Sequence, residues 1–332
     1  MKASRYILIR IVMWVLTIWM GVTLIFIIPR LMPADPIQNM IAMMEHQAGP
    51  MPAAEREAMV AQMQRQFGLD ESLWNQYTSF LLNGVLRFDF GPSLMNFPTP
   101  ARDIIFRNLP YTFGLMIVSL IVSWTIGNII GLLAGFRKDK LSSKIMESIA
   151  IFIYPIPIFI IALVFQIVLG FVLGWLPISA VIFGEVWSAQ WISTLIRSAA
   201  LPMLTLVVLG LGWWIISMKA LSMSTAQEDF VMFARYRGLS EGEIGRKYVL
   251  RNTVLPQVTM LGLSMGGVFG GSVIVENVFN FPGVGRLMLI AVGASDFNMI
   301  MGGVTITIIA VTTATLIVDL LIPFIDPRVR RS

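Results

Sequence analysis

Six apolar segments, each long enough to cross about 30 Å of hydrocarbon as a helix, dominate this sequence. Hydrophobic residues make up 56% of the chain and charged residues only 13%, which is typical of a polytopic membrane protein and not of a soluble domain. We therefore predict an all-α polytopic membrane protein with six transmembrane helices. The predicted spans are Ile7 to Ile28, Tyr111 to Gly135, Ile149 to Gly174, Leu201 to Met218, Val254 to Val275 and Met299 to Phe324.

The basic residues are spread unevenly over the connections, and this asymmetry predicts the orientation of the chain. With the N-terminus in the cytoplasm, 16 of the 24 basic residues fall on the cytoplasmic side. Six of the remaining eight lie in the long first outer loop, which the positive-inside rule discounts because long loops translocate regardless of charge. The short outer loops carry only Arg197 and Arg286, so we predict that both termini are cytoplasmic.

These spans divide the chain into an N-terminal anchor helix, an extracytoplasmic loop, a five-helix core and a cytoplasmic tail. The first span lacks a small-residue cleavage pattern, which favours a retained anchor over a signal peptide. The core contains a long cytoplasmic loop at residues 219–253. The four parts are residues 1–28, 29–110, 111–325 and 326–332.

The outer loop at 29–110 has the composition of a small helical subdomain. Its middle, Ala53 to Phe67, is rich in helix formers, and an i, i+3, i+4 apolar pattern begins at Trp74, so we expect one or two short helices. Six methionines fall between Met40 and Met63. A methionine-rich copper site is conceivable, but their helix-like spacing and the absence of a Met-x-x-Met repeat favour packing.

Glycine and proline mark special positions inside the spans. Gly127, Gly131 and Gly135 are spaced by four, and such a ridge lets a neighbouring helix approach closely. Pro155 and Pro157 should kink or unwind the third span, which lipid tolerates only where other helices or a water-filled cavity satisfy the freed carbonyl groups. The fifth span is dense in glycine, for close packing, hinge freedom or both. Its glycines are Gly262, Gly266, Gly267, Gly270 and Gly271.

Asp319, in the sixth span, is the only acid that the sequence places clearly inside the membrane. An intramembrane acid can relay protons. This one lies near the cytoplasmic end, with Arg328 and Arg330 close behind it, which favours a structural ion pair or cap.

Residues 225–256 form a charged, glycine-broken stretch between two apolar segments. Thr225 with Glu228 and Ser240 with Glu243 have the spacing of capping boxes, so we predict two short helices here. Gly238 sits where the first helix must end, because glycine adopts the left-handed conformation without a steric penalty. Pro256 lacks an amide proton and should disturb the helix that follows. The stretch is thus predicted to be a rigid lever on the cytoplasmic face.

The sequence excludes several kinds of chemistry. There is no cysteine and only one histidine, His46, so we predict no metal site. The dipeptide Gly-Lys never occurs, so there is no P-loop, and any ATPase must be another chain. We find no catalytic constellation, and we predict no cofactor on this chain and no nucleic-acid partner.

The loop resembles the cytoplasmic EAA loop of ABC-importer permeases, in the form used by the dipeptide and oligopeptide branch. The match falls on Ala234, Arg235, Arg237, Gly238, Leu239, Ser240, Arg251, Asn252, Leu255 and Pro256. It continues along the chain at Arg30, Pro33, Asp35, Pro36, Phe67 to Leu69, Gln76, Tyr77, Phe88 to Leu94, Leu109, Pro110, Gly174 to Pro177, Gly271 to Arg286, and Asp326 to Arg328.

This sequence departs from the family pattern at a few positions. Met232 and Phe233 stand where the general motif has Glu and Ala, Ala34 replaces a common glycine, and Pro323 interrupts the final helix. The last departure leaves the shape of the C-terminal helix open.

The resemblance implies the type I ABC importer permease fold, in a bacterial-type inner membrane. It implies that the loop docks in a groove of a cytoplasmic ATPase. Phe230, Phe233 and Ala234 are expected to form an apolar face for that groove or for the chain's own membrane ends, and Arg235 and Arg237 can pair with acidic groups on a partner. An amphipathic loop resting on anionic lipid is the alternative. The residues assigned to ATPase coupling are Phe230, Phe233, Ala234, Arg235, Arg237, Gly238, Leu239 and Ser240, with Arg251, Asn252, Leu255 and Pro256 at the junction with the next span.

The implied partners are a second, similar permease, two ABC ATPase subunits that bind ATP and Mg²⁺, an extracytoplasmic substrate-binding protein, and membrane lipid. On the outer side, the segment from Glu276 to Arg286 is expected to form a re-entrant turn or a short helix. Its Glu276, Pro282, Gly283 and Gly285 are assigned to an outer gate or to binding-protein docking.

Three questions stay open at this level. Relatives in this branch carry peptides, oligosaccharides, nickel or glutathione, and we expect peptides here. A proton-coupled secondary transporter using Asp319 and a membrane scaffold without transport activity are the alternative classes.

Overall fold

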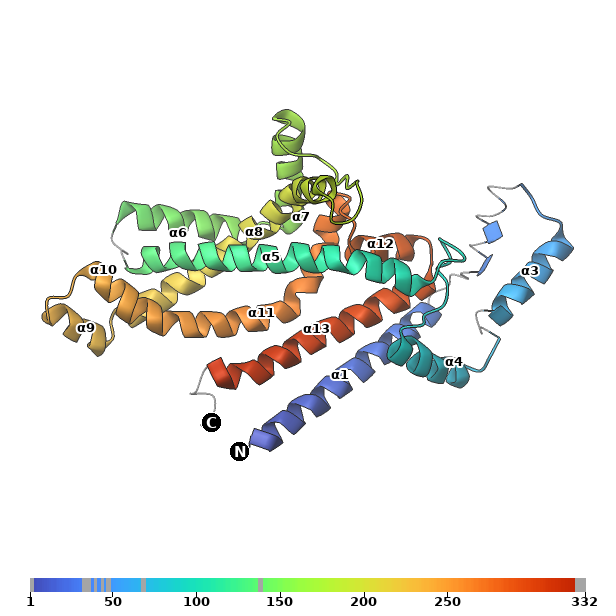
Figure 1. The fold of residues 1–332 in the computed structure, drawn as a ribbon, viewed down its shortest axis with the longest axis horizontal. Helices are drawn as coiled ribbons and strands as arrows, with labels where there is room; N and C mark the ends of the chain where they lie inside the picture. The colour runs from blue at the N-terminus through green and yellow to red at the C-terminus, as the bar shows by residue number, and fades with distance from the viewer. Residues whose placement is uncertain are drawn as a thin grey trace. The chain divides into compact units, whose positions relative to one another are not determined.

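The computed structural model describes residues 3–31, 37–38, 41–42, 45, 49–66, 70–136 and 140–325, except for the side chains of residues 3–4, 66, 266–271 and 322–325. Within these residues every regular element is a helix, as predicted (Figure 1). The chain forms two compact units. The first contains residues Thr112–Phe281 and Ala314–Ser332 with Met1–Ala3, and the second contains Ser4–Tyr111 and Pro282–Thr313.

The first unit is built from long apolar helices joined by short connections (Figure 1). It holds most of α5 and all of the elements up to α11. These are α5 (Ala101–Phe136), α6 (Leu141–Ile153), α7 (Ile158–Phe165), the π-helix η2 (Gln166–Val172), α8 (Ala189–Thr225), α9 (Asp229–Tyr236), α10 (Glu241–Ile244), the π-helix η3 (Gly245–Leu250) and α11 (Arg251–Val278).

The glycine ridge of α5 packs directly on α8. A Cβ atom added at Gly127 would lie 2.4 Å from the Trp214 Cβ atom, and one at Gly131 would lie 2.7 Å from the Ile215 carbonyl oxygen. At Gly135 the nearest atom would be the Lys219 carbonyl oxygen, at 2.6 Å. Contacts this short leave no room for any side chain, so the predicted close approach is confirmed and its partner is α8.

The second unit contains α1 (Ala3–Leu31), α12 and the first half of α13, together with the small helices of the outer loop. Its main cluster of buried residues includes Val22, Phe26, Ile105 and Ile300. The other elements are α3 (Ala53–Gln66), α4 (Leu73–Ser79), the π-helix η1 (Phe80–Val85), α12 (Val284–Gly293) and α13 (Phe297–Ile325).

Four helices of the described chain are long and apolar enough to cross a membrane, or five if the bent pair of α6 with α7 and η2 counts as one span. The predicted ends were wrong in two places. The second span begins at Ala101 and not after Pro110, which lies inside α5. The fourth runs from Ala189 to Thr225, well beyond Leu201 to Met218 on both sides. In both cases polar residues extend an apolar helix past the limit that hydropathy alone can detect.

The proline pair in the third predicted span does more than kink it. α6 ends at Ile153, α7 begins at Ile158, and the two parts are bent by 104°. Pro155 and Pro157 have no amide proton to donate, so regular helix bonding stops between them. The single span predicted from Ile149 to Gly174 is therefore two helices meeting at a sharp angle.

The outer loop contains the predicted short helices. α3 matches the expected helix from Ala53, although Phe67 to Leu69 lie outside the described residues. Met63 is 8% exposed and packs with Ile37, Ile41 and Met59, which supports the packing interpretation of the methionines. His46, Met40, Met43, Met44, Pro33, Ala34, Asp35 and Pro36 also lie outside the described residues.

Two residues of the resemblance, far apart in sequence, meet in the second unit. The Nη2 atom of Arg30 donates to the Oε1 atom of Gln76 at 2.8 Å, and the guanidinium lies over the ring of Phe26. The hydroxyl groups of Tyr77 and Thr23 are 2.7 Å apart. These bonds fix α4 to the end of α1.

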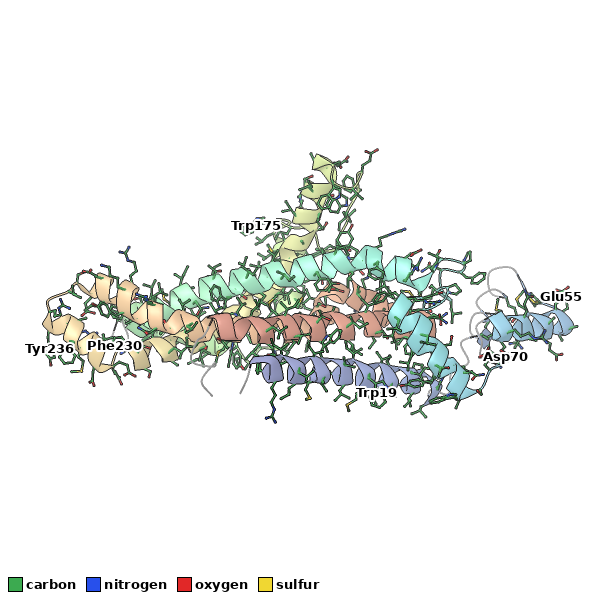
Figure 2. The ribbon with its side chains drawn as sticks, turned by 60° about the horizontal axis from the view of Figure 1, so that its bottom comes forward. Trp19, Glu55, Asp70, Trp175, Phe230 and Tyr236 are labelled. Carbon is green, nitrogen blue, oxygen red and sulfur yellow. The ribbon has the colours of Figure 1, made fainter. Side chains whose placement is uncertain are left out.

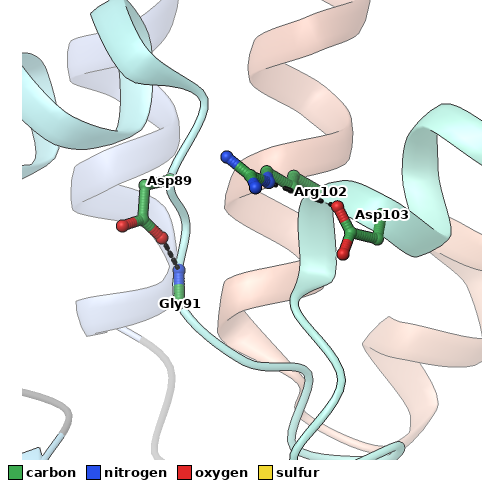
Figure 3. Close-up of polar contacts among 4 residues, drawn as sticks. All are labelled: Asp89, Gly91, Arg102 and Asp103. Atoms are coloured by element: carbon green, nitrogen blue, oxygen red, sulfur yellow. Dashed lines mark hydrogen bonds and ion pairs between the residues drawn. The ribbon is translucent and has the colours of Figure 1, made fainter.

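The segment that leads into α5 is held by short-range polar contacts (Figure 3). The amide of Gly91 donates to Asp89 Oδ1 at 3.2 Å, and Gly91 has a φ of +81°. Arg102 Nε donates to Asp103 Oδ1 at 3.2 Å, in the first turn of α5. The chain thus turns sharply at Gly91 and then starts a long helix.

Candidate functional site

The helical part of the charged stretch at residues 225–256 begins later than expected. α8 continues through Thr225, and α9 starts at Asp229 with Glu228 as its N-cap residue, which makes no side-chain capping bond. The capping box predicted for Thr225 and Glu228 was therefore wrong. Thr225 lies at the C-terminal end of a helix, where its hydroxyl cannot cap a helix start.

Gly238 ends α9 as predicted. Its φ is +76°, in the left-handed region that glycine adopts without strain. The Gly238 amide donates to the Arg235 carbonyl at 2.9 Å, and the Leu239 amide donates to the Ala234 carbonyl at 3.3 Å. These two bonds form a Schellman motif, which satisfies the last carbonyl groups of the helix and turns the chain sharply.

Ser240 caps α10 on the other side of the turn. Its hydroxyl accepts from the Glu243 amide at 3.3 Å, so half of the second capping box is confirmed. The Glu243 carboxylate does not complete the box, because it accepts a hydrogen bond from Lys247 Nζ at 2.7 Å. This bond and the charge of Lys247 lower the pKa of Glu243.

The two arginines at the turn, Arg235 and Arg237, have different surroundings. Arg235 Nε lies 3.2 Å from Glu241 Oε1, so this guanidinium, predicted to meet a partner's acid, already has an acidic neighbour across the turn. Arg237 is exposed. The Arg235 bridge closes the loop between α9 and α10.

α9 has two different faces. Val231 and Ala234 are buried in a cluster with Ile244 and Val249, and the ends of α5 (Leu132 and Phe136) and Leu239 pack against it. Outside this cluster, α9 carries large apolar side chains in solvent: Phe230 is 39% exposed, Met232 42%, Phe233 66% and Tyr236 80%. We call these four residues the exposed apolar face. Figure 2 shows Phe230 and Tyr236 at the same end of the first unit as the turn between α9 and α10.

This arrangement separates the residues of the predicted apolar face, Phe230, Phe233 and Ala234. Ala234 belongs to the chain's own core, because it points at α5 and η3. Met232 and Tyr236, which the sequence analysis did not assign to the face, are exposed beside Phe233. Tyr236 lies three residues after Phe233 and four after Met232, and this helical spacing was the signal that could have revealed them.

The second predicted short helix is not separate from the next span. α10, η3 and α11 follow one another without a break from Glu241 to Val278, and Pro256 lies inside α11. Proline is tolerated there because neighbouring groups in a helix bundle can satisfy the freed carbonyl. Of the other junction residues, Arg251 and Asn252 are exposed, Leu255 is half-buried, and Asn252 Nδ2 donates to the Tyr248 carbonyl at 2.7 Å.

Comparison with known proteins identifies the family. Residues 127–331 match the family described as binding-protein-dependent transport system inner membrane component. The chain is 30% identical to the glutathione transport system permease protein of Escherichia coli (strain K12), over 98% of this chain and 99% of the relative. It is 28% identical to the dipeptide transport system permease protein of Lactococcus lactis subsp. cremoris (strain MG1363), with the same coverage. The chain belongs to this permease family. It is the permease subunit of a binding-protein-dependent ABC importer.

Behind the loop, the permease has an ion pair that the sequence analysis missed. Lys219 is only 8% exposed, and its Nζ atom pairs with the Glu147 carboxylate, joining α8 to α6. A basic residue next to a span looked like a topology signal alone. Its partner lies 72 residues away in the sequence, so no local pattern could reveal the pair.

A buried amide ties the permease's α11 to two further helices. Gln257 is 0% exposed, and its Nε2 atom donates to Ser217 Oγ of α8 at 2.9 Å. Its backbone carbonyl accepts from Trp124 Nε1 of α5 at 3.1 Å. The start of α11 is therefore fixed to both α5 and α8 close to the cytoplasmic loop.

The outer-gate residues do not form one loop. Glu276 lies within α11, one residue past the predicted end of the fifth span, is 0% exposed, and accepts a hydrogen bond from Thr112 Oγ1 at 2.8 Å. Gly283 is the N-cap residue of α12, which Pro282 precedes and in which Gly285 is buried. The short helix expected in this segment is confirmed as α12.

Some predictions fall outside the described residues. Arg328 and Arg330, the proposed neighbours of Asp319, are among them, together with Asp326 and Pro327. Asp319 itself is half-buried in α13. The family assignment decides against the proton-coupled class, because the family's transport depends on a binding protein.

Proposed function

We propose that this permease imports di- or oligopeptides and that α9 receives the force of ATP hydrolysis through the exposed apolar face. The proposal rests on the exposed apolar face of α9. Four large apolar side chains stand in solvent on a helix whose other side is anchored in the protein. Such a patch indicates a protein partner, and aromatic residues of this kind contribute most to binding at interfaces.

The contacts behind α9 support a coupling role. Val231 and Ala234 fix α9 to the end of α5, and the glycine ridge fixes α5 to α8. A displacement of α9 would therefore move α5 and α8 together, since close-packed interiors transmit strain. ATP and Mg²⁺ would be bound by the partner ATPases, and this chain would carry out no bond chemistry.

The proposed topology keeps six spans. α11 has 28 residues, which correspond to about 42 Å of helix and exceed the roughly 30 Å of hydrocarbon. With the bent pair counted as one span, α11 would be the sixth. The excess of basic residues in the proposed cytoplasmic segments supports cytoplasmic N- and C-termini in a bacterial-type inner membrane.

The complete importer would contain a second, similar permease, two ATPase subunits and an extracytoplasmic binding protein that docks on the outer segments, including α12. Two relatives carry the names of dipeptide and glutathione systems. Glutathione is itself a tripeptide, so both names support a peptide substrate over an oligosaccharide or nickel.

The proposed coupling can be tested by truncating the exposed apolar face. We expect the double variant Phe233→Ala with Tyr236→Ala to weaken association with the ATPases at least tenfold, because each removes an aromatic anchor from an interface. Co-purification in detergent and binding-protein-stimulated ATPase activity in proteoliposomes are the measurements. The matched control is Phe183→Ala, which truncates an exposed ring (52%) in the loop before α8. Normal association and uptake in the double variant would show that α9 is not the coupling element.

A further inference from the structure

A cavity of about 690 Å³ lies within the first unit, among α5, α8, α11 and the bend between α6 and α7. This volume falls in the range of sites that bind small molecules, about 300–1,000 Å³. Neither the sequence patterns nor the family comparison assigned its lining residues a role. The lining residues include Ser119, Ser123, Tyr154, Leu209, Trp213 and Ser264.

The chemistry of the lining is apolar with a few hydroxyl groups. None of the described residues that line the cavity is Asp, Glu, Lys, Arg or His. The rings of Tyr154 and Trp213 stack at a centroid distance of 6.0 Å and form one aromatic wall. The hydroxyls of Ser119, Ser123 and Ser264 donate to carbonyls of their own helices at 2.6–3.0 Å. Ser119 and Ser123 are buried, but Ser264 is half-buried, and its oxygen atom can still accept a hydrogen bond from a ligand.

The bend in the third span is the second, independent observation. Tyr154 and Ile158, which flank Pro155 and Pro157, both line the cavity. Irregular backbone at membrane depth is tolerated where it is buried in protein or lines a water-filled cavity. The break in helix bonding and the cavity therefore occur at the same place.

Close helix packing shapes the same region. A Cβ atom at Gly212 would lie 3.1 Å from Tyr154 Cβ, so glycine lets the bend approach α8. At Gly210 an added Cβ atom would lie 2.7 Å from Ser123 Oγ. Because Gly210 and Gly212 have no side chains, Ser123 and Tyr154 can lie close to α8, where they line the cavity.

From these observations we infer that the cavity is this permease's share of the substrate path and that it accepts peptides with uncharged, apolar side chains. A charged side chain would lose its hydration here without meeting an opposite charge, which is costly. An apolar side chain would contact the rings of Tyr154 and Trp213, and a peptide N–H group could donate to the Ser264 oxygen atom. This inference rests on the proposed import of peptides and names the class of peptide.

The absence of native cysteine allows a direct test by cysteine labelling. Ser264→Cys places a thiol of nearly the same size in the wall of the cavity, at a half-buried position, whereas Ser119 and Ser123, 3% and 2% exposed, are too buried for labelling. The assembled importer in lipid nanodiscs would be treated with a water-soluble, cationic methanethiosulfonate reagent, with and without tri-leucine or tri-lysine. Two controls are Val164→Cys, 49% exposed on α7, and Thr205→Cys, 0% exposed on α8.

We expect the Ser264→Cys thiol to react at least tenfold faster than either control, and tri-leucine, but not tri-lysine, to slow the reaction. Reaction no faster than at Val164 would overturn the inference, since the cavity would then be closed to water or filled by lipid. Equal protection by both peptides would overturn the assigned substrate class, and protection by neither would remove the cavity from the path. Labelling does not depend on ATPase coupling, so these outcomes are distinguishable from failure of the α9 variants.

Discussion

Replacing Gly131 by alanine should separate α5 from α8. The added Cβ atom would lie 2.7 Å from the Ile215 carbonyl oxygen and 2.8 Å from the Met218 Cβ atom. Ordinary contacts begin at 3.4 Å, so the helices would have to move apart by about 0.7 Å, the difference between 3.4 Å and 2.7 Å. Overpacking of this kind costs about 1–3 kcal/mol. Backbone atoms cannot change rotamer to avoid the clash, so we expect the full effect.

Gly114→Ala is the matched control, because it lies on the same helix and an added Cβ atom would meet nothing within 4 Å. Both substitutions gain the same helix propensity, about 0.8–1 kcal/mol relative to glycine. The difference between their free energies of unfolding, measured by titration with dodecyl sulfate in mixed micelles, therefore reports the clash alone. If Gly131→Ala is as stable as Gly114→Ala, the argument for direct helix contact is refuted.

Three further predictions concern the cytoplasmic end of the first unit. Gly238→Ala should cost about 1–2 kcal/mol, because alanine resists a φ of +76°, and it should lower binding-protein-stimulated ATPase activity. Glu147→Gln should lower the thermal midpoint more than Lys219→Met, because it leaves a nearly buried ammonium without its carboxylate whereas the second change removes the ammonium. The lowered pKa of Glu243 predicts that its bond to Lys247 stabilises the fold above pH 4.5 and that this contribution disappears as the pH falls through the folded-state pKa. The thermal midpoints of Glu243→Gln and the unmodified chain should therefore differ at pH 7 and converge once the pH has fallen below the folded-state pKa of Glu243.

Local patterns predicted the features that depend on local chemistry. The left-handed Gly238, the Ser240 cap and the contact of Gly131 with another helix each follow from a few neighbouring residues. Hydropathy located the spans that the structure describes, but not their ends, because α5 and α8 continue through polar residues. A helix continues as long as its backbone bonds are satisfied, whatever its side chains.

Features that depend on distant residues were missed. Which side of α9 is buried depends on Leu132 and Phe136, about a hundred residues earlier in the sequence. Glu276 appeared to be an outer-loop acid because the sequence does not show that Thr112 lies opposite it. Pairings of this kind arise only when helices assemble.

The unbroken helical path from Glu241 to Val278 also limits how the length of this segment can vary. One residue inserted within α11 would rotate everything beyond it by about 100° and carry Glu276 away from Thr112. Four inserted residues would almost restore the phase, but would shift the carboxylate by about 6 Å along the axis. A change in length is tolerated better in η3, because the wider turns of a π-helix already accommodate extra residues. A single deletion there could tighten the turn into an ordinary α-helix and leave both flanking segments in register.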